Sequence, residues 1–123
     1  MVNIQVLGVS KVIANLTAQK KSIQLKAAKA IKDSGFYVEG QVKDSINGKK
    51  AEPKSVDTGR FLGSVKTSSP SKFQVEVGTP VEYAPALEYG TSRMAPRRHF
   101  ANTAVREKSK VRKFVEDKIK GII

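Results

Sequence analysis

The first apolar pattern in the chain has the two-residue period of a β-strand. Over residues 2–7 the polar residues Asn3 and Gln5 separate apolar ones, and Gly8 follows. Such alternation is typical of a strand that has one buried face and one exposed face. We therefore expect a half-buried strand at the start of the chain.

The next segment has the period of an amphipathic helix. From about Ser10 onward, apolar or small residues recur every three, four or seven positions, as on one helix face. This stripe comprises Val12, Leu16, Ile23, Ala27, Ala30 or Ile31, Ser34, Val38, Val42 and Ile46. A continuous helix over 10–46 would be about 54 Å long at the usual rise per residue. Gly35 and Gly40 are compatible with a bend or break near its middle.

The middle of the chain predicts a loop, a short helix and a hairpin. Residues 47–56 are polar and contain a glycine and a proline, so we expect a mobile surface loop there that could become ordered on assembly. Asp57 or Thr58 can cap a short helical turn over 61–65. Two strands are expected at 65–68 and 73–77, joined by the connection Ser69-Pro70-Ser71.

The last third predicts a short helix followed by a long one. Residues 83–89 carry Pro85 where a first helical turn tolerates it, and Gly90 stands where a helix commonly ends. From Phe100 a second stripe comprises Phe100, Ala104, Val111, Val115, Ile119 and Ile122. The predicted fold is a single α+β domain over 1–123, with a small antiparallel β-sheet packed against a long N-terminal helix and a C-terminal helix.

Charge adds information because it is unevenly distributed. Residues 1–50 carry nine Lys and three acids (+6), 51–92 carry four Lys or Arg and five acids (−1), and 93–123 carry ten Lys or Arg and three acids (+7), for a total of +12. Both ends should be attracted to polyanions or acidic protein surfaces. A lysine-coated helix surface without a partner is the alternative.

Several kinds of chemistry find little support in the sequence. Without cysteine the chain has no disulfide, thiolate zinc site or cysteine nucleophile. His99 is the only histidine, so we expect it to pack or cap beside Phe100 rather than catalyse. The opening ten residues are too short and too polar to span a membrane or to act as a signal peptide, which favours a cytoplasmic place of synthesis and assembly.

The segment 81–100 gathers acids, tyrosines, arginines and the histidine. Glu82 and Glu88 are better explained as acids that flank tyrosines, with one of them ion-paired to Arg60 or Arg93, than as an acid–base pair. We predict an Arg60–Glu88 pair in particular. The tyrosines at 83 and 89 are expected to be packing groups rather than base-stacking ones. Residues that could contact a partner or DNA are Arg93, Arg97, Arg98, Arg106, Lys110 and Lys113.

Three blocks of residues, at 57–65, 77–91 and 96–104, together resemble a family of small bacteriophage proteins. These are the tail-component, or tail-completion, proteins of long-tailed phages and prophages. The residues that carry the resemblance are Thr58, Gly59, Arg60, Gly78, Tyr83, Ala84, Glu88, Gly90, Thr91, Pro96 and Phe100. Phe61 stands at, or one position from, a leucine of the family pattern, and two residues could be inserted between Arg97 and Phe100.

The resemblance implies a structural virion protein without catalysis, cofactor or metal. It would act at the neck, joining the tail tube or tail terminator to the head completion and connector proteins. A ring, with six copies beside a six-fold tail, is the natural expectation, as is assembly in the bacterial cytoplasm. A small basic DNA-binding or packaging protein that contacts duplex DNA non-specifically is the alternative.

Overall fold

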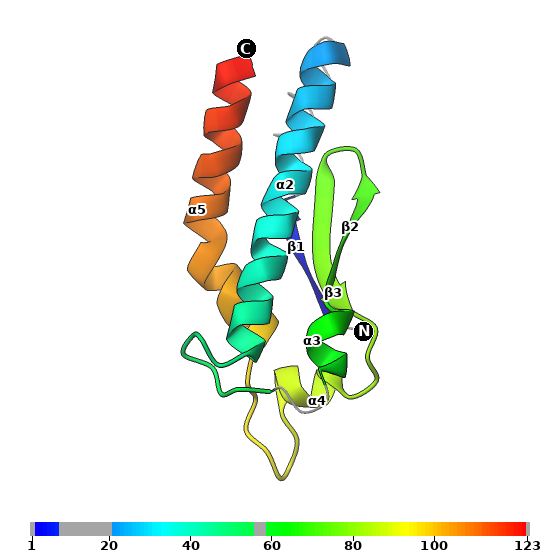
Figure 1. Cartoon of the computed structure of the whole chain (residues 1–123), viewed down its shortest axis with the longest axis vertical. Helices are drawn as coiled ribbons and strands as arrows, with labels where there is room; N and C mark the ends of the chain where they lie inside the picture. Colours follow the sequence, from blue (N-terminus) through cyan, green and yellow to red (C-terminus); the bar gives the residue numbers. More distant parts are fainter. Residues whose placement is uncertain (1, 8–20, 56–58, 123) are drawn as a thin grey trace.

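The computed structural model describes residues 2–7, 21–55 and 59–122, and it confirms the α+β class (Figure 1). Its elements follow the chain as β1 (Val2–Leu7), α2 (Lys21–Ile46), α3 (Arg60–Ser64), β2 (Lys66–Ser71), β3 (Gln74–Thr79), α4 (Ala84–Tyr89) and α5 (His99–Ile122). The start predicted for the first long helix, near residue 10, lies outside the described residues.

The sheet has the order β1-β3-β2, and both neighbouring pairs are antiparallel. In the central strand β3, Val75, Val77 and Thr79 are buried while the residues between them are partly exposed. Strand β2 is an edge strand, and most of its residues are exposed. Alternation along β3 is what a sheet with one covered face requires.

The hairpin differs from the prediction at its turn. Strand β2 continues to Ser71, and the connection to β3 is Lys72-Phe73 rather than Ser69-Pro70-Ser71. The β2–β3 register is irregular between Ser68 and Ser71, so that Pro70 passes along the edge where it need not donate a hydrogen bond. Phe73, in the turn, is buried and packs in the core.

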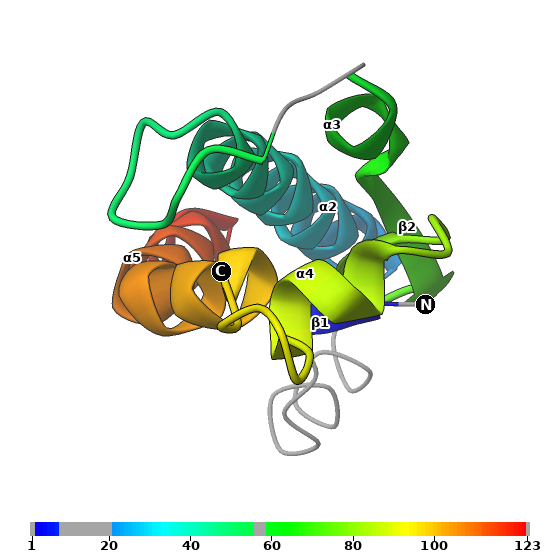
Figure 2. The same cartoon turned by 90° about the horizontal axis from the view of Figure 1, so that it is seen from below.

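Helices α2 and α5 lie side by side and run in opposite directions, and both contact the sheet (Figures 1 and 2). The predicted stripe of α2 is confirmed from Ala27 to Ile46, and the helix is unbroken at Gly35 and Gly40. A Cβ added at Gly35 would overlap the side chain of Val75. Gly35 is therefore needed for the close approach of α2 to the sheet, not for a bend.

The buried apolar residues form two clusters. The larger includes Val42, Phe61, Val77 and Phe100, and the smaller includes Phe73 and residues of α2, β3 and α5. None of the described helices combines the length and the apolarity that crossing a membrane requires.

Candidate functional site

The sequence blocks singled out above meet at the lower end of the molecule. There the C-terminal end of α2, the loop 47–55, helix α4 and the first turn of α5 come together (Figures 1 and 2). We call the segment from α4 to the first turn of α5, residues 84–101, the elbow. Its geometry decides what the site can do.

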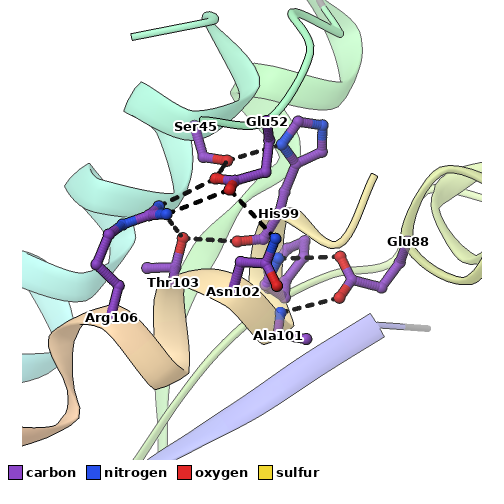
Figure 3. Close-up of polar contacts among 9 residues, drawn as sticks. Ser45, Glu52, Glu88, His99, Ala101, Asn102, Thr103 and Arg106 are labelled. Carbon is purple, nitrogen blue, oxygen red and sulfur yellow. Dashed lines mark hydrogen bonds and ion pairs between the residues drawn. The ribbon is translucent and has the colours of Figure 1, made fainter. Parts of the chain in front are cut away.

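Glu88 is the polar centre of the elbow. Its side chain is buried, and its two carboxylate oxygens accept hydrogen bonds from the backbone N–H groups of Phe100 and Ala101, each at 2.9 Å (Figure 3). These N–H groups belong to the first turn of α5, where they have no partner within the helix. A negative charge there also interacts favourably with the helix dipole. Glu88 therefore caps the N-terminus of α5, although it lies eleven residues before His99, the first residue of that helix.

The predicted ion pair between Arg60 and Glu88 is wrong. Arg60 instead donates from both terminal nitrogens to Glu82, each at 2.8 Å, and lies over the ring of Tyr83. The Arg60–Glu82 pair is exposed, whereas a buried carboxylate at Glu88 is better satisfied by two backbone donors than by a surface cation. Hydrogen bonding to Glu82 raises the pKa of Arg60, and the same contact lowers the pKa of Glu82.

Pro85 and Gly90 delimit α4 as predicted. Pro85 stands in the first turn, and the N–H of Gly90 donates to the carbonyl of Ala86. Gly90 has φ 80°, and a Cβ there would lie 2.8 Å from the backbone nitrogen of Pro96. The N–H of Arg97 then returns to the carbonyl of Leu87 at 2.8 Å. These contacts hold the chain on both sides of the 91–94 turn.

Other residues of the sequence blocks have structural positions of several kinds. Gly59 adopts φ 83° immediately before α3, whereas Thr58 lies outside the described residues. A Cβ at Gly78 would lie 2.7 Å from the carbonyl oxygen of Val2, so the pairing of β3 with β1 requires a glycine. Ala84 is fully buried, and Thr91 is exposed.

The two tyrosines of the elbow region differ in their environment. Tyr83 packs edge-on against Phe61, with ring centroids 6.0 Å apart, and remains 37% exposed. Tyr89 is 68% exposed, so the prediction that it is a packing group is wrong for this chain in isolation. The side chain of Tyr89 points outward because the inner face of α4 is occupied by Ala84 and Glu88.

His99 is fully buried and links α5 to the neighbouring loop. Its Nδ1 lies 2.8 Å from Ser45 Oγ and its Nε2 lies 2.7 Å from Ser55 Oγ. Ser45 donates its single proton to Glu52 at 2.6 Å, so it must accept from Nδ1–H, and Ser55 donates to Nε2. Burial lowers the pKa of His99 to about 4, with the nearby Arg97 contributing. The predicted packing role of His99 is confirmed, against Phe61.

Glu52 is the buried acid of this network. It accepts hydrogen bonds from Ser45, from Asn102 and from both terminal nitrogens of Arg106 (Figure 3). Burial raises the pKa of Glu52, but the hydrogen bonds from Arg106, Ser45 and Asn102 together hold it at about 2. The carboxylate is therefore charged in the folded protein and fastens the loop to α5.

These anchors bear on the loop predicted to be mobile. Glu52 is only 6% exposed, and Ser55 is held by His99 and by Arg97 Nη1 at 2.8 Å. The N–H of Ser55 also donates to the carbonyl of Ile46. Mobility of 47–56 stays a prediction, and these contacts argue against it for the Glu52–Ser55 half.

The serine–histidine pair invites comparison with a catalytic one. In a Ser-His-acid triad the histidine accepts the serine proton and an acid contacts its other nitrogen. Here Nδ1 contacts a serine rather than an acid, and a histidine of pKa about 4 is a weak base for a serine hydroxyl. The hydrogen bonds of His99 join the start of α5 to Ser45 of α2 and to Ser55 of the loop. Among the described residues, no group of three or more His, Asp or Glu is placed to hold a metal ion.

The basic residues predicted to contact a partner or DNA separate into two groups. Arg97 donates to the Lys54 carbonyl and to Ser55, and Arg106 pairs with Glu52, so both guanidinium groups are engaged within the chain. The side chains of Arg93, Arg98, Lys110 and Lys113 are exposed. For these four, contact with a partner or DNA stays a prediction.

Sequence reasoning missed the buried polar network. One signal of it is present in the sequence of α5, where His99, Thr103 and Glu107 recur every four residues beside the apolar stripe. All three of these residues are buried. Thr103 donates to the carbonyl of His99, and Glu107 accepts from the Tyr37 hydroxyl at 2.9 Å. Burial, followed by the contact with Glu107, raises the pKa of Tyr37.

Comparison with known proteins identifies the family. Residues 10–90 match the model of the HK97-gp10-like family, described as "Bacteriophage HK97-gp10, putative tail-component". Comparison with curated proteins and with solved structures gave no significant match. The matched range includes the block at 57–65 and most of the block at 77–91, whereas Pro96 and Phe100 lie after its end. The match covers well over half of the 123 residues, and the chain therefore belongs to the HK97-gp10-like family of bacteriophage tail components.

Proposed function

We propose that this tail component acts in tail completion and head–tail joining at the neck of the virion. It would dock as a ring of copies, six beside a six-fold tail, without catalysis, cofactor or metal. Its partners would be the tail terminator and the head completion or connector proteins, and assembly would take place in the cytoplasm of the bacterial host. Membership of the tail-component family supports a structural role in the virion.

The observation that carries the proposal is the construction of the elbow. A buried charge at Glu88 ties α4 to the first turn of α5, while Tyr83 and Tyr89 of the same block keep exposed rings. Tyrosine is enriched at protein interfaces, because its ring provides a large contact area with few rotatable bonds. An element already held in place also loses less conformational entropy when it binds. The elbow therefore suits a rigid docking contact between subunits.

Particle assembly tests this proposal. In a phage or prophage that lacks the protein, full heads and finished tails should accumulate separately or join unstably. Wild-type protein supplied in trans should restore joining, and Tyr89→Ser should restore it poorly. Phe36→Ser, which also removes an exposed aromatic ring but lies in α2, is the matched control and should restore joining. Normal particles without the protein would refute the proposal.

The alternative, a DNA-binding or packaging protein, is favoured by one observation. The basic first half of α2 and the basic second half of α5 lie side by side (Figure 1). Binding of the free protein to duplex DNA at increasing salt separates the two functions. Tight binding that weakens steeply with salt would favour the alternative, because phosphate contacts release counterions.

A further inference from the structure

The two long helices form a groove at the end of the molecule opposite the elbow. Figure 1 shows α2 and α5 extending past the β2–β3 hairpin at its upper end. The groove between them has a volume of about 260 Å³ and is open to solvent. It is lined by Lys26, Lys29, Ala30, Asp33, Phe114 and Lys118.

The rim of this groove is basic. Three ammonium groups, those of Lys26, Lys29 and Lys118, accompany a single carboxylate, that of Asp33. Residues 21–32 of α2 contain four lysines and no acid, so the surrounding surface has the same sign of charge. An occupant with several negative charges would be attracted to it.

The groove also has an apolar component. Phe114, which lines the groove, is 40% exposed. Lys118 Nζ lies 5.7 Å from the centroid of the Phe114 ring. A phosphate backbone gains nothing from an exposed phenyl ring in this position, whereas an aliphatic side chain would bury it.

We propose that the groove between α2 and α5 is a docking site for an acidic amphipathic segment of a partner protein. The segment would place an aliphatic side chain against Phe114 and Ala30, and its carboxylates would pair with Lys26, Lys29 and Lys118. A helix laid into an apolar groove between two helices is a recurrent mode of peptide recognition. A helix of a second copy of this chain is disfavoured as the occupant, because both of its long helices carry net positive charge and would be repelled by the basic rim.

This inference deepens the proposed docking role and rests on it for its biological meaning, but its test is independent. The full chain is titrated into two fluorescently labelled synthetic peptides of about four helical turns, both rich in leucine and glutamate. One has its leucines on a single helix face. The other has the same composition in an order that disperses them. A labelled DNA duplex is the third probe, and anisotropy reports binding.

The amphipathic peptide should bind at least about tenfold more tightly than its dispersed counterpart. Phe114→Ser and Lys29→Glu should each weaken that binding by about tenfold or more, and both positions are open enough for the variants to fold, which circular dichroism checks. Lys66→Glu, the same charge change at an exposed residue of β2, should alter it less than about twofold.

Four results would overturn the proposal. The first three are failure of the amphipathic peptide to bind, equal binding of both peptides, and equal loss of binding from Lys29→Glu and Lys66→Glu. Tighter binding of the duplex that is insensitive to Phe114→Ser would also overturn it, in favour of DNA. Failure here combined with the assembly defect described above would leave the proposed neck function standing.

Discussion

Replacement of Glu88 tests the central contact of the elbow. In Glu88→Ala, the N–H groups of Phe100 and Ala101 lose their acceptors, and Phe100 is only 1% exposed, so water cannot readily replace the carboxylate there. The free energy of unfolding should fall. Glu88→Gln keeps the side-chain volume and one carbonyl acceptor, so it should be intermediate between the wild type and alanine.

The size of the loss follows from the contacts. Removal of a helix cap costs about 0.5–2 kcal/mol. A charge at a partly buried helix N-terminus contributes up to about 2 kcal/mol, and a buried donor left without a partner costs about 1–3 kcal/mol. These effects overlap, and relief of the buried charge offsets part of them, so we expect about 2–4 kcal/mol for Glu88→Ala.

Denaturant unfolding measures this loss, and amide hydrogen exchange at residues 100 and 101 reports it locally. Glu82→Ala is the matched control, because it also removes one negative charge from the same block. The Glu82 side chain is exposed and paired on the surface with Arg60, so its replacement should cost less than about 1 kcal/mol. Equal destabilisation by the two replacements, with unchanged exchange at 100 and 101, would refute the capping role.

Three further predictions concern pH and two glycines. Because the pKa of His99 is about 4 when folded and 6.5 ordinarily, the unfolded state binds the proton first, and stability should fall by up to about 3 kcal/mol as pH drops from 6.5 to 4. Glu52, whose pKa is about 2 when folded, adds a further loss of stability only below pH 4.5. Because His99 is the only histidine, a urea unfolding midpoint that does not change between pH 7 and pH 4.5 would contradict the predicted effect of His99. Gly35→Ala should lower the melting temperature, because the clash with Val75 has a net cost of about 1–2 kcal/mol. A raised melting temperature would refute the close approach of α2 to the sheet at Gly35. Gly40 lies in open space on the same helix, so Gly40→Ala should stabilise α2 by up to about 1 kcal/mol and raise the melting temperature. A lowered melting temperature would contradict this prediction.

The local pattern of the sequence determined the fold class and most of the secondary structure, but not the turn of the β2–β3 hairpin. Periods of two residues in β1 and β3, and of three to four in α2 and α5, were sufficient to place these elements, because each buries one face against the rest of the chain. Pro85 and Gly90 delimited α4 because proline and glycine act through their own backbone geometry. The motif blocks likewise indicated the family, since their spacing lies within the sequence itself.

Only the tertiary structure decided which polar groups meet. Glu88 faces a helix end rather than Arg60, and Glu52, predicted to lie in a mobile loop, is buried against α5. Gly35 proved to be a contact point rather than a bend, because Val75 approaches it from a distant strand. The choice of partner depends on how the elements pack, and residues such as Glu52 and Arg106, 54 positions apart, leave no periodic trace of their contact in the sequence.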